Sequence, residues 1–112
     1  MEYNKAVDNL LVGIGDSYAN WGWGKLGPNT DRVNEFRNGL KVKSGRKFDK
    51  VIENNRVWGF VAKTDGVHKG IPHKKGDVFK AAGWRAPAKH VRGTIFSSET
   101  NWFSWTGPNY RL

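Results

Sequence analysis

The residues best suited to chemistry lie in one short stretch, FKAAGWRAPAKHVRG at positions 79–93. This stretch combines four cations and a histidine with one tryptophan and a rigid Ala-Pro-Ala, and it contains no acid. Such residues suit an anionic ligand, because cations neutralise phosphates and a tryptophan beside a guanidinium offers a plane on which unpaired bases stack. The alternative is that Trp84 fills the core of a sheet while the cations simply face water.

The positive charge extends beyond this stretch. Residues 66–98 carry seven Lys and Arg and one acid, Asp77, and so have a net charge of +6. Pro87 fixes its own φ and favours an extended Ala86, so Arg85 and Lys89 should flank a stiff turn. We expect these cations to form one continuous surface that faces water. The predicted nucleic-acid contacts are Lys69, Lys74, Lys75, Lys80, Trp84, Arg85, Lys89, His90 and Arg92.

Other chemical motifs are weak. A metal site usually needs three or four ligands, and His68 and His73 lie five apart across a proline, a spacing that no helix face provides. Residues 22–27 match the string G-x-G-x-x-G, but a dinucleotide site needs a helix directly after it, and Pro28 follows instead. The acids are scattered singly, as on a solvated strand face, and no nucleophile motif is present. We therefore predict a protein that is not an enzyme and needs no metal or cofactor.

Composition points to the same class. The chain has 112 residues and a net charge of +9, which is typical of proteins that meet polyanions. Residues 1–31 carry −2, so residues 32–112 carry +11. There is no cysteine, which excludes disulfides and thiolate catalysis. Because no leader and no long apolar run is visible, we expect a soluble, intracellular protein with no membrane contact.

The elements that must position these residues can be predicted from periodicity. Apolar residues at spacings of three and four predict a helix over residues 3–20, and a second helix should cover residues 30–38, capped by Asn29 or Thr30. Residues 42–63 read as extended chain with a two-residue turn at Asn54 and Asn55, which would set Ile52 opposite Val57. Glu53 would then face Arg56. Further strands are expected at residues 76–82 and 93–97, separated from the first two by a projecting loop at residues 64–75.

These elements predict one α+β domain over residues 1–112, with one or two N-terminal helices against a small twisted antiparallel sheet of about four strands. Residues 1–40 form the helical and loop part, residues 41–97 the basic sheet and residues 98–112 an aromatic C-terminal extension. The extension is too apolar for a disordered tail and should pack back onto the domain.

The segment around Trp84 also resembles a group of small, uncharacterised proteins encoded by tailed bacteriophages. The resemblance covers roughly residues 45–96 and rests on GRKF at 45–48, VWGFV at 57–61 and the run from GDVFK at 76–80 through WRAPAK at 84–89 to RGTIF at 92–96. The loop at residues 65–75 and the C-terminal extension depart from the shared pattern. The resemblance implies a phage origin and action in the host bacterial cytoplasm, and it brings no established activity.

The sequence therefore predicts a phage-encoded nucleic-acid-binding protein of low sequence specificity, which prefers single strands of DNA or RNA to duplex. The alternative is a host-directed interaction protein that uses the same cations to bind, and inhibit, an acidic bacterial protein.

Overall fold

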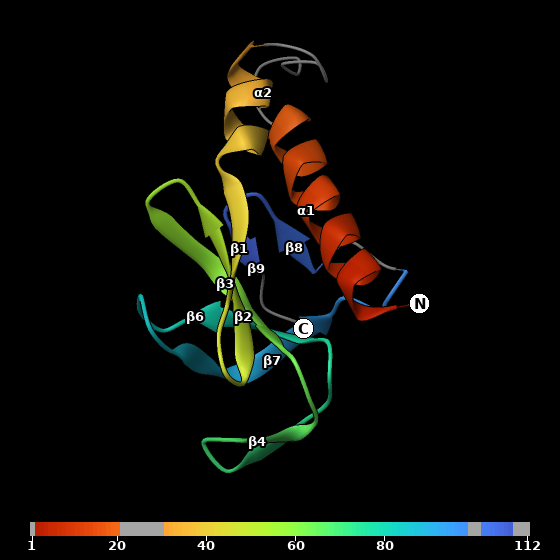
Figure 1. The fold of residues 1–112 in the computed structure, drawn as a ribbon, viewed down its shortest axis with the longest axis vertical. Helices are drawn as coiled ribbons and strands as arrows, with labels where there is room; N and C mark the ends of the chain where they lie inside the picture. The colour runs from red at the N-terminus through yellow and green to blue at the C-terminus, as the bar shows by residue number, and fades with distance from the viewer. Residues whose placement is uncertain (1, 21–30, 99–101, 109–112) are drawn as a thin grey trace.

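A computed structural model of the chain describes residues 2–20, 31–98 and 102–108 (Figure 1). Two helices precede the strands, and the main sheet has five antiparallel strands in the order β1-β2-β3-β6-β7. The α+β class is confirmed, with one strand more in this sheet than expected. The elements are α1 (Tyr3–Ala19), α2 (Asp31–Asn38), β1 (Leu40–Ser44), β2 (Phe48–Glu53), β3 (Arg56–Ala62), β4 (Gly66–His68), β5 (Ile71–His73), β6 (Asp77–Ala81), β7 (Pro87–Thr94), β8 (Phe103–Ser104) and β9 (Gly107–Pro108).

Helix α1 follows its apolar periodicity closely. The Glu2 side chain caps the first turn by accepting a hydrogen bond from the Asn4 N–H at 3.3 Å. Val7, Leu10 and Ile14 are buried against the sheet, as their spacing requires. Helix α2 also lies where it was expected, and the residues proposed to cap it lie outside the described residues.

The turn between β2 and β3 confirms the predicted register. Asn54 has a φ of 53°, a conformation that asparagine tolerates well, and Ile52 pairs with Val57. The register then shifts, because Val51 pairs with Gly59 and leaves Trp58 as the extra residue of a bulge. Trp58 is 1% exposed in the core beneath α1, where its Nε1 donates to the Ser104 carbonyl at 2.8 Å.

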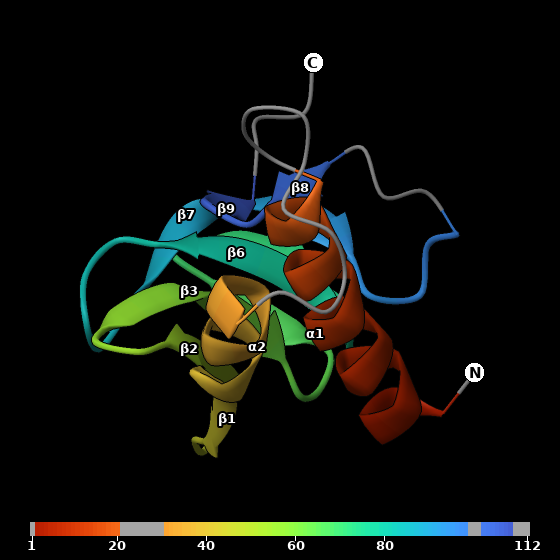
Figure 2. The same ribbon diagram turned by 90° about the horizontal axis from the view of Figure 1, so that it is seen from above.

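The two faces of the main sheet differ in what covers them. Helix α1 and the C-terminal strands β8 and β9 lie on one face (Figure 2). Trp102 is 7% exposed in this layer, so the prediction that the C-terminal segment packs back onto the domain is confirmed for its described residues. The opposite face carries a smaller group of aromatic side chains, which we call the phenylalanine cluster: Phe48, Phe60 and Phe79.

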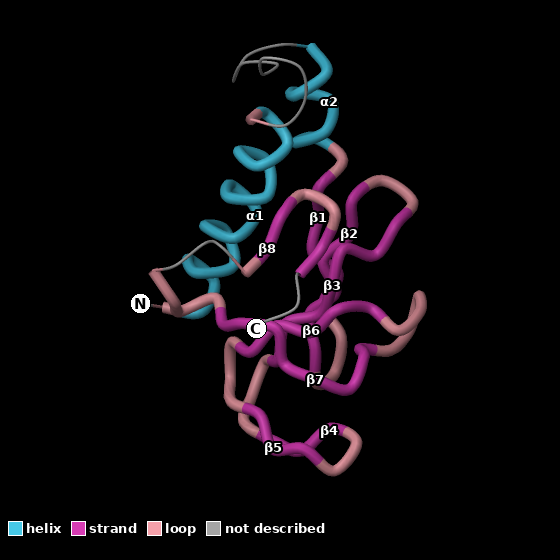
Figure 3. The backbone as a smooth tube through the Cα atoms, turned by 180° about the vertical axis from the view of Figure 1, so that it is seen from behind, coloured by secondary structure: helices cyan, strands magenta, loops and turns pink. Residues whose placement is uncertain are grey.

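Two predicted segments differ from the structure. The loop expected at residues 64–75 contains the β4–β5 hairpin, which extends beyond the main sheet (Figure 3). The last strand of the main sheet is β7, which begins at Pro87, so the strand expected at residues 93–97 was placed too late. Proline is tolerated as the first residue of a strand. The stiff turn lies just before it, where the Ala82 and Gly83 N–H groups donate to the Ala86 carbonyl at 2.9 and 3.3 Å.

Candidate functional site

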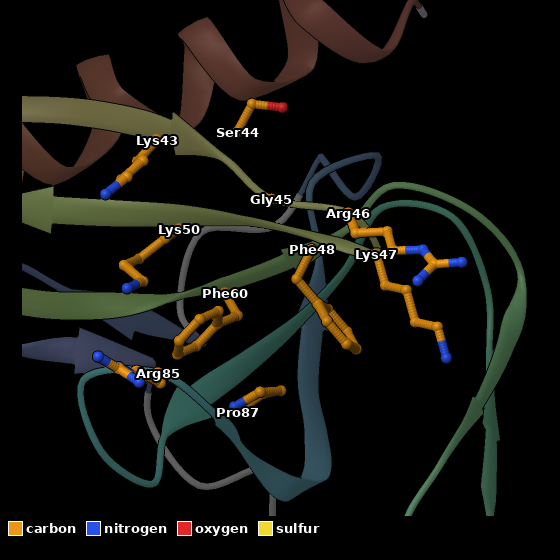
Figure 4. Close-up of a pocket in the computed structure, with 10 residues that line it drawn as sticks. All are labelled: Lys43, Ser44, Gly45, Arg46, Lys47, Phe48, Lys50, Phe60, Arg85 and Pro87. Carbon is orange, nitrogen blue, oxygen red and sulfur yellow. The ribbon is translucent and has the colours of Figure 1, made fainter.

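Arg85 faces residues of β1, β2 and the loop between them across a pocket of about 260 Å³ (Figure 4). Phe48, Phe60 and Pro87 form its apolar part. Figure 4 shows Lys43, Lys50 and Arg85 on one side of these rings, and Arg46 and Lys47 on the other. We call this site the basic pocket; it is lined by Lys43, Ser44, Gly45, Arg46, Lys47, Phe48, Lys50, Phe60, Arg85 and Pro87.

Strand pairing explains why these side chains meet. Lys43 pairs with Lys50, and Lys50 pairs with Phe60, so the three residues form a row across β1, β2 and β3. Residues directly opposite each other in an antiparallel sheet point to the same face. The row continues through the pairing of Phe60 with Phe79. The basic pocket therefore lies on the face of the phenylalanine cluster, away from α1.

The loop between β1 and β2 is held in place by hydrogen bonds. The Gly45 N–H donates to the Phe48 carbonyl at 3.0 Å, and a Cβ at Gly45 would lie only 2.5 Å from that oxygen. Glycine is therefore required by this close approach. The Lys63 ammonium donates to Ser44 Oγ at 2.8 Å and to the Gly45 carbonyl at 3.0 Å. These bonds fix the backbone that carries Arg46 and Lys47.

The five cations of the basic pocket are not neutralised by carboxylates of the described chain. No acid lines the pocket, and the ion pairs of the described residues lie elsewhere, at Arg37–Asp16, Arg56–Glu53 and Lys63–Asp49. Asp49, although it lies between Lys47 and Lys50 in sequence, is 7% exposed and accepts a hydrogen bond from the Tyr3 hydroxyl at 2.8 Å. Burial raises the pKa of Tyr3, and its bond to Asp49 raises it further, so Tyr3 remains a donor.

Trp84 borders the basic pocket and does not fill the core. Its side chain is 51% exposed, so the alternative in which Trp84 fills the core of the sheet is wrong. The Lys50 ammonium lies 4.8 Å from the centre of the Trp84 ring and 5.9 Å from that of Phe60, a geometry that favours cation–π attraction. The exposed part of the indole is open to a stacking ligand, and Lys50 holds the ring beside the pocket.

The structure disperses the other residues that the sequence suggested. Arg92 was expected to face water, but it is 8% exposed, because it is the extra residue of a bulge between the pairs Val78–Gly93 and Phe79–Val91. Lys75 lies on another side, where its ammonium is 5.4 Å from the Tyr3 ring. The expected single continuous surface of these residues is therefore not formed.

The remaining predicted residues are exposed but do not line the basic pocket. Lys69 lies in the turn between β4 and β5, with a φ of 52°. Lys80 lies between two residues that both pack in the phenylalanine cluster, so strand alternation points its side chain to the other face. Lys74, Lys89 and His90 are exposed as well. Of the nine predicted contact residues, Arg85 alone lines the basic pocket, and Trp84 borders it.

Sequence reasoning missed the four cations of the first hairpin, Lys43, Arg46, Lys47 and Lys50. The signal was present, because residues 41–50, KVKSGRKFDK, carry five cations and one acid. We interpreted Asp49 between Lys47 and Lys50 as part of a solvated strand face, and the pairing that joins these cations to Arg85 could not be seen in the sequence.

Comparison with known proteins shows one family. A family model for proteins of unknown function, DUF7717, matches residues 16–110. The chain belongs to this family. The match includes every residue of the basic pocket, and it does not test the resemblance to phage proteins, which stays a prediction. No curated protein and no solved structure matches.

Within residues 2–20, 31–98 and 102–108, neither helix combines the length and hydropathy that crossing a bilayer requires. In the same residues, no three His, Cys, Asp or Glu side chains come together as a metal site would need.

Proposed function

We propose that this member of DUF7717 binds nucleic acid with low sequence specificity and prefers single strands to duplex. The observation that carries the proposal is the basic pocket itself: five cations with no lining acid surround three apolar rings, beside a tryptophan that is half exposed. Cations supply phosphate contacts, and exposed aromatic faces supply stacking that tolerates any base.

The preference for single strands follows from the shape and the chemistry of the pocket. At about 260 Å³ it is slightly smaller than pockets for drug-sized ligands, which run from roughly 300 to 1,000 Å³, so it suits one nucleotide rather than a double helix. Phe60 is only 3% exposed, so the ring faces left for an unpaired base to stack on are those of the half-buried Phe48 and the half-exposed Trp84. Bases in a duplex are already stacked and paired, so a duplex would use only the cations.

The low sequence specificity follows from the groups that line the pocket. Lysine, arginine and phenylalanine side chains contact phosphate oxygens and ring faces, which are common to all nucleotides. On the resemblance to phage proteins, we further propose that this binding takes place in the cytoplasm of an infected bacterium.

The proposal is tested by titrating fluorescent single-stranded and duplex oligonucleotides at several salt concentrations. The pocket variant carries Lys43→Gln, Lys50→Gln and Arg85→Gln. The matched control carries Lys69→Gln, Lys74→Gln and Lys80→Gln, which removes the same charge from exposed sites outside the pocket.

We expect the pocket variant to lose most single-strand affinity and to flatten the slope of log affinity against log salt by about two, since each phosphate contact on a single strand contributes about 0.7. The control should change both quantities much less. Equal losses in the two variants would show that binding follows net charge alone and would reject the basic pocket as the site.

The same titration separates this proposal from binding to an acidic host protein, which the cations would also attract. An interface with a protein should respond weakly to salt and depend on apolar anchors. If no oligonucleotide binds, while capture from nuclease-treated bacterial lysate recovers an acidic protein only with the wild-type pocket, the nucleic-acid proposal is wrong.

A further inference from the structure

A second cavity, of about 300 Å³, adjoins the basic pocket. Lys47 and Phe48 line both, so Phe48 forms a wall between them. The β4–β5 hairpin and the segment before it supply the other lining residues, Thr64, Asp65, Gly66, Val67, His68 and His73. A ligand that follows the basic pocket past Phe48 would therefore reach this cavity next.

The cavity has a firm aromatic lining. The Phe48 ring centre lies 5.5 Å from that of His68 and 5.6 Å from that of His73, and both imidazoles also pack against Phe79, at 5.4 and 5.7 Å. The His68 Nε2 lies 3.1 Å from the Pro87 carbonyl, a hydrogen bond that joins the hairpin to β7. Because these contacts hold the hairpin against the sheet, the cavity exists before any ligand binds.

The Asp65 carboxylate is the acceptor that the cavity presents to a ligand. Asp65 is exposed, and its Oδ1 accepts a hydrogen bond from the Lys75 N–H at 2.8 Å, which orients the carboxylate and leaves Oδ2 able to accept another bond. His73 is 8% exposed, and its Nδ1 has no hydrogen-bond partner among the described residues. That nitrogen is itself covered by protein atoms, so the carboxylate of Asp65 is the group that a ligand in the cavity reaches.

We propose that this second cavity is a nucleobase subsite that prefers bases with an exocyclic amino group: cytosine, adenine or guanine. The inference rests on the proposed function. A carboxylate accepts a hydrogen bond from such an amino group, as in the known pairing of Asp with cytosine N4. Uracil and thymine present a carbonyl oxygen at ring position 4 and carry their donor on N3 instead, so a carboxylate placed for the cytosine amino group would face an acceptor. Lys47, shared by both cavities, is placed to contact the phosphate between two successive nucleotides.

The sharpest comparison uses fluorescent oligo(dC) and oligo(dU) of equal length at neutral pH, since these two bases have the same size and differ only in the group at ring position 4 and in the proton on N3. Asp65→Asn keeps an oxygen for the Lys75 N–H and replaces the other oxygen by a donor. Asp77→Asn is the matched control, because Asp77 accepts a bond from the neighbouring Lys74 N–H at 2.9 Å but does not line the cavity. Circular dichroism checks that both variants are folded.

We expect the wild-type chain to bind oligo(dC) about tenfold more tightly than oligo(dU), the lower part of the range for a specific base contact. Asp65→Asn should remove or invert this ratio, whereas Asp77→Asn should leave it unchanged. Equal binding of the two oligonucleotides by the wild type, or the same loss of discrimination in both variants, would overturn the subsite and leave the proposed function standing. Absence of binding to every oligonucleotide would reject both.

Discussion

The hydroxyl group of Tyr3 makes the most testable contribution to stability. It donates to Asp49 Oδ2 at 2.8 Å and joins the start of α1 to β2. Asp49 is 7% exposed, so loss of the donor leaves a largely buried carboxylate without this hydrogen bond. Hydrogen bonds to charged groups contribute about 1.5–3 kcal/mol. Tyr3→Phe keeps the ring and should lower the free energy of unfolding by about that amount, or the Tm by roughly 6–12 °C for a chain of this size.

The same bond predicts a dependence on pH. Burial raises the pKa of Tyr3 above its ordinary value near 10, and the bond to Asp49 adds to this effect. Above pH 10 the unfolded chain loses the Tyr3 proton while the folded chain keeps it. Stability from this group is therefore complete below about pH 10 and declines as the pH rises above it.

The assay is urea unfolding of the wild type and Tyr3→Phe from pH 7 to pH 11. The difference between the unfolding free energies of the two proteins should be constant up to about pH 9 and should narrow above pH 10. The reason is that only the wild type has a hydroxyl at position 3 that can ionise in the unfolded chain. Affinity for single strands should not change, since Tyr3 does not line the basic pocket. A gap below about 0.5 kcal/mol at pH 7, or one that stays constant through pH 11, would refute the reasoning.

Three further predictions concern Trp84, Gly93 and the cations of the basic pocket. Trp84→Ala should weaken single-strand binding by about 1–3 kcal/mol, the contribution of one stacked base, with Trp84→Phe restoring part of the loss in the same titration. Gly93→Ala should destabilise the fold by about 1–3 kcal/mol in urea, because its Cβ would lie 2.4 Å from Trp102 Cδ2, whereas Gly83→Ala, which meets nothing within 4 Å, should be nearly neutral. Raising the salt from about 0.01 to 0.15 M should raise the Tm of the wild type more than that of the pocket variant, because screening relieves repulsion among the pocket cations.

Local patterns determined what the sequence could predict. The spacing of Val7, Leu10 and Ile14 defines α1, and the pair of asparagines at the β2–β3 turn sets the register of that hairpin. Both depend on residues within a few positions of each other. The neighbouring positions of Trp84 and Arg85 can be read from a short segment too, whereas the sequence left open whether Trp84 is buried or exposed.

Long-range pairing determined what the sequence could not predict. Lys50 meets Trp84 only because β2, β3, β6 and β7 are neighbours in that order and the turn before β7 returns toward β2. Arg92 is buried by a bulge whose position depends on the partner strand, and periodicity within one strand cannot reveal it. Four of the five cations of the basic pocket therefore belong to the β1–β2 hairpin, and the charge count alone gave no reason to place that hairpin beside Arg85.

Two unfavourable features coincide at the basic pocket. Lys43 and Lys50 lie directly opposite each other on neighbouring strands, an arrangement of like charges that destabilises a sheet. Trp84 leaves half of its side chain in water close by. Folded chains depart from local rules chiefly where a site requires it. A ligand that carries both phosphates and unpaired bases relieves the repulsion and covers the indole together, and by mass action its binding would stabilise the fold by about 2.7 kcal/mol at a hundredfold excess over Kd. A purely acidic partner would relieve only the repulsion between the lysines and would leave the Trp84 indole uncovered.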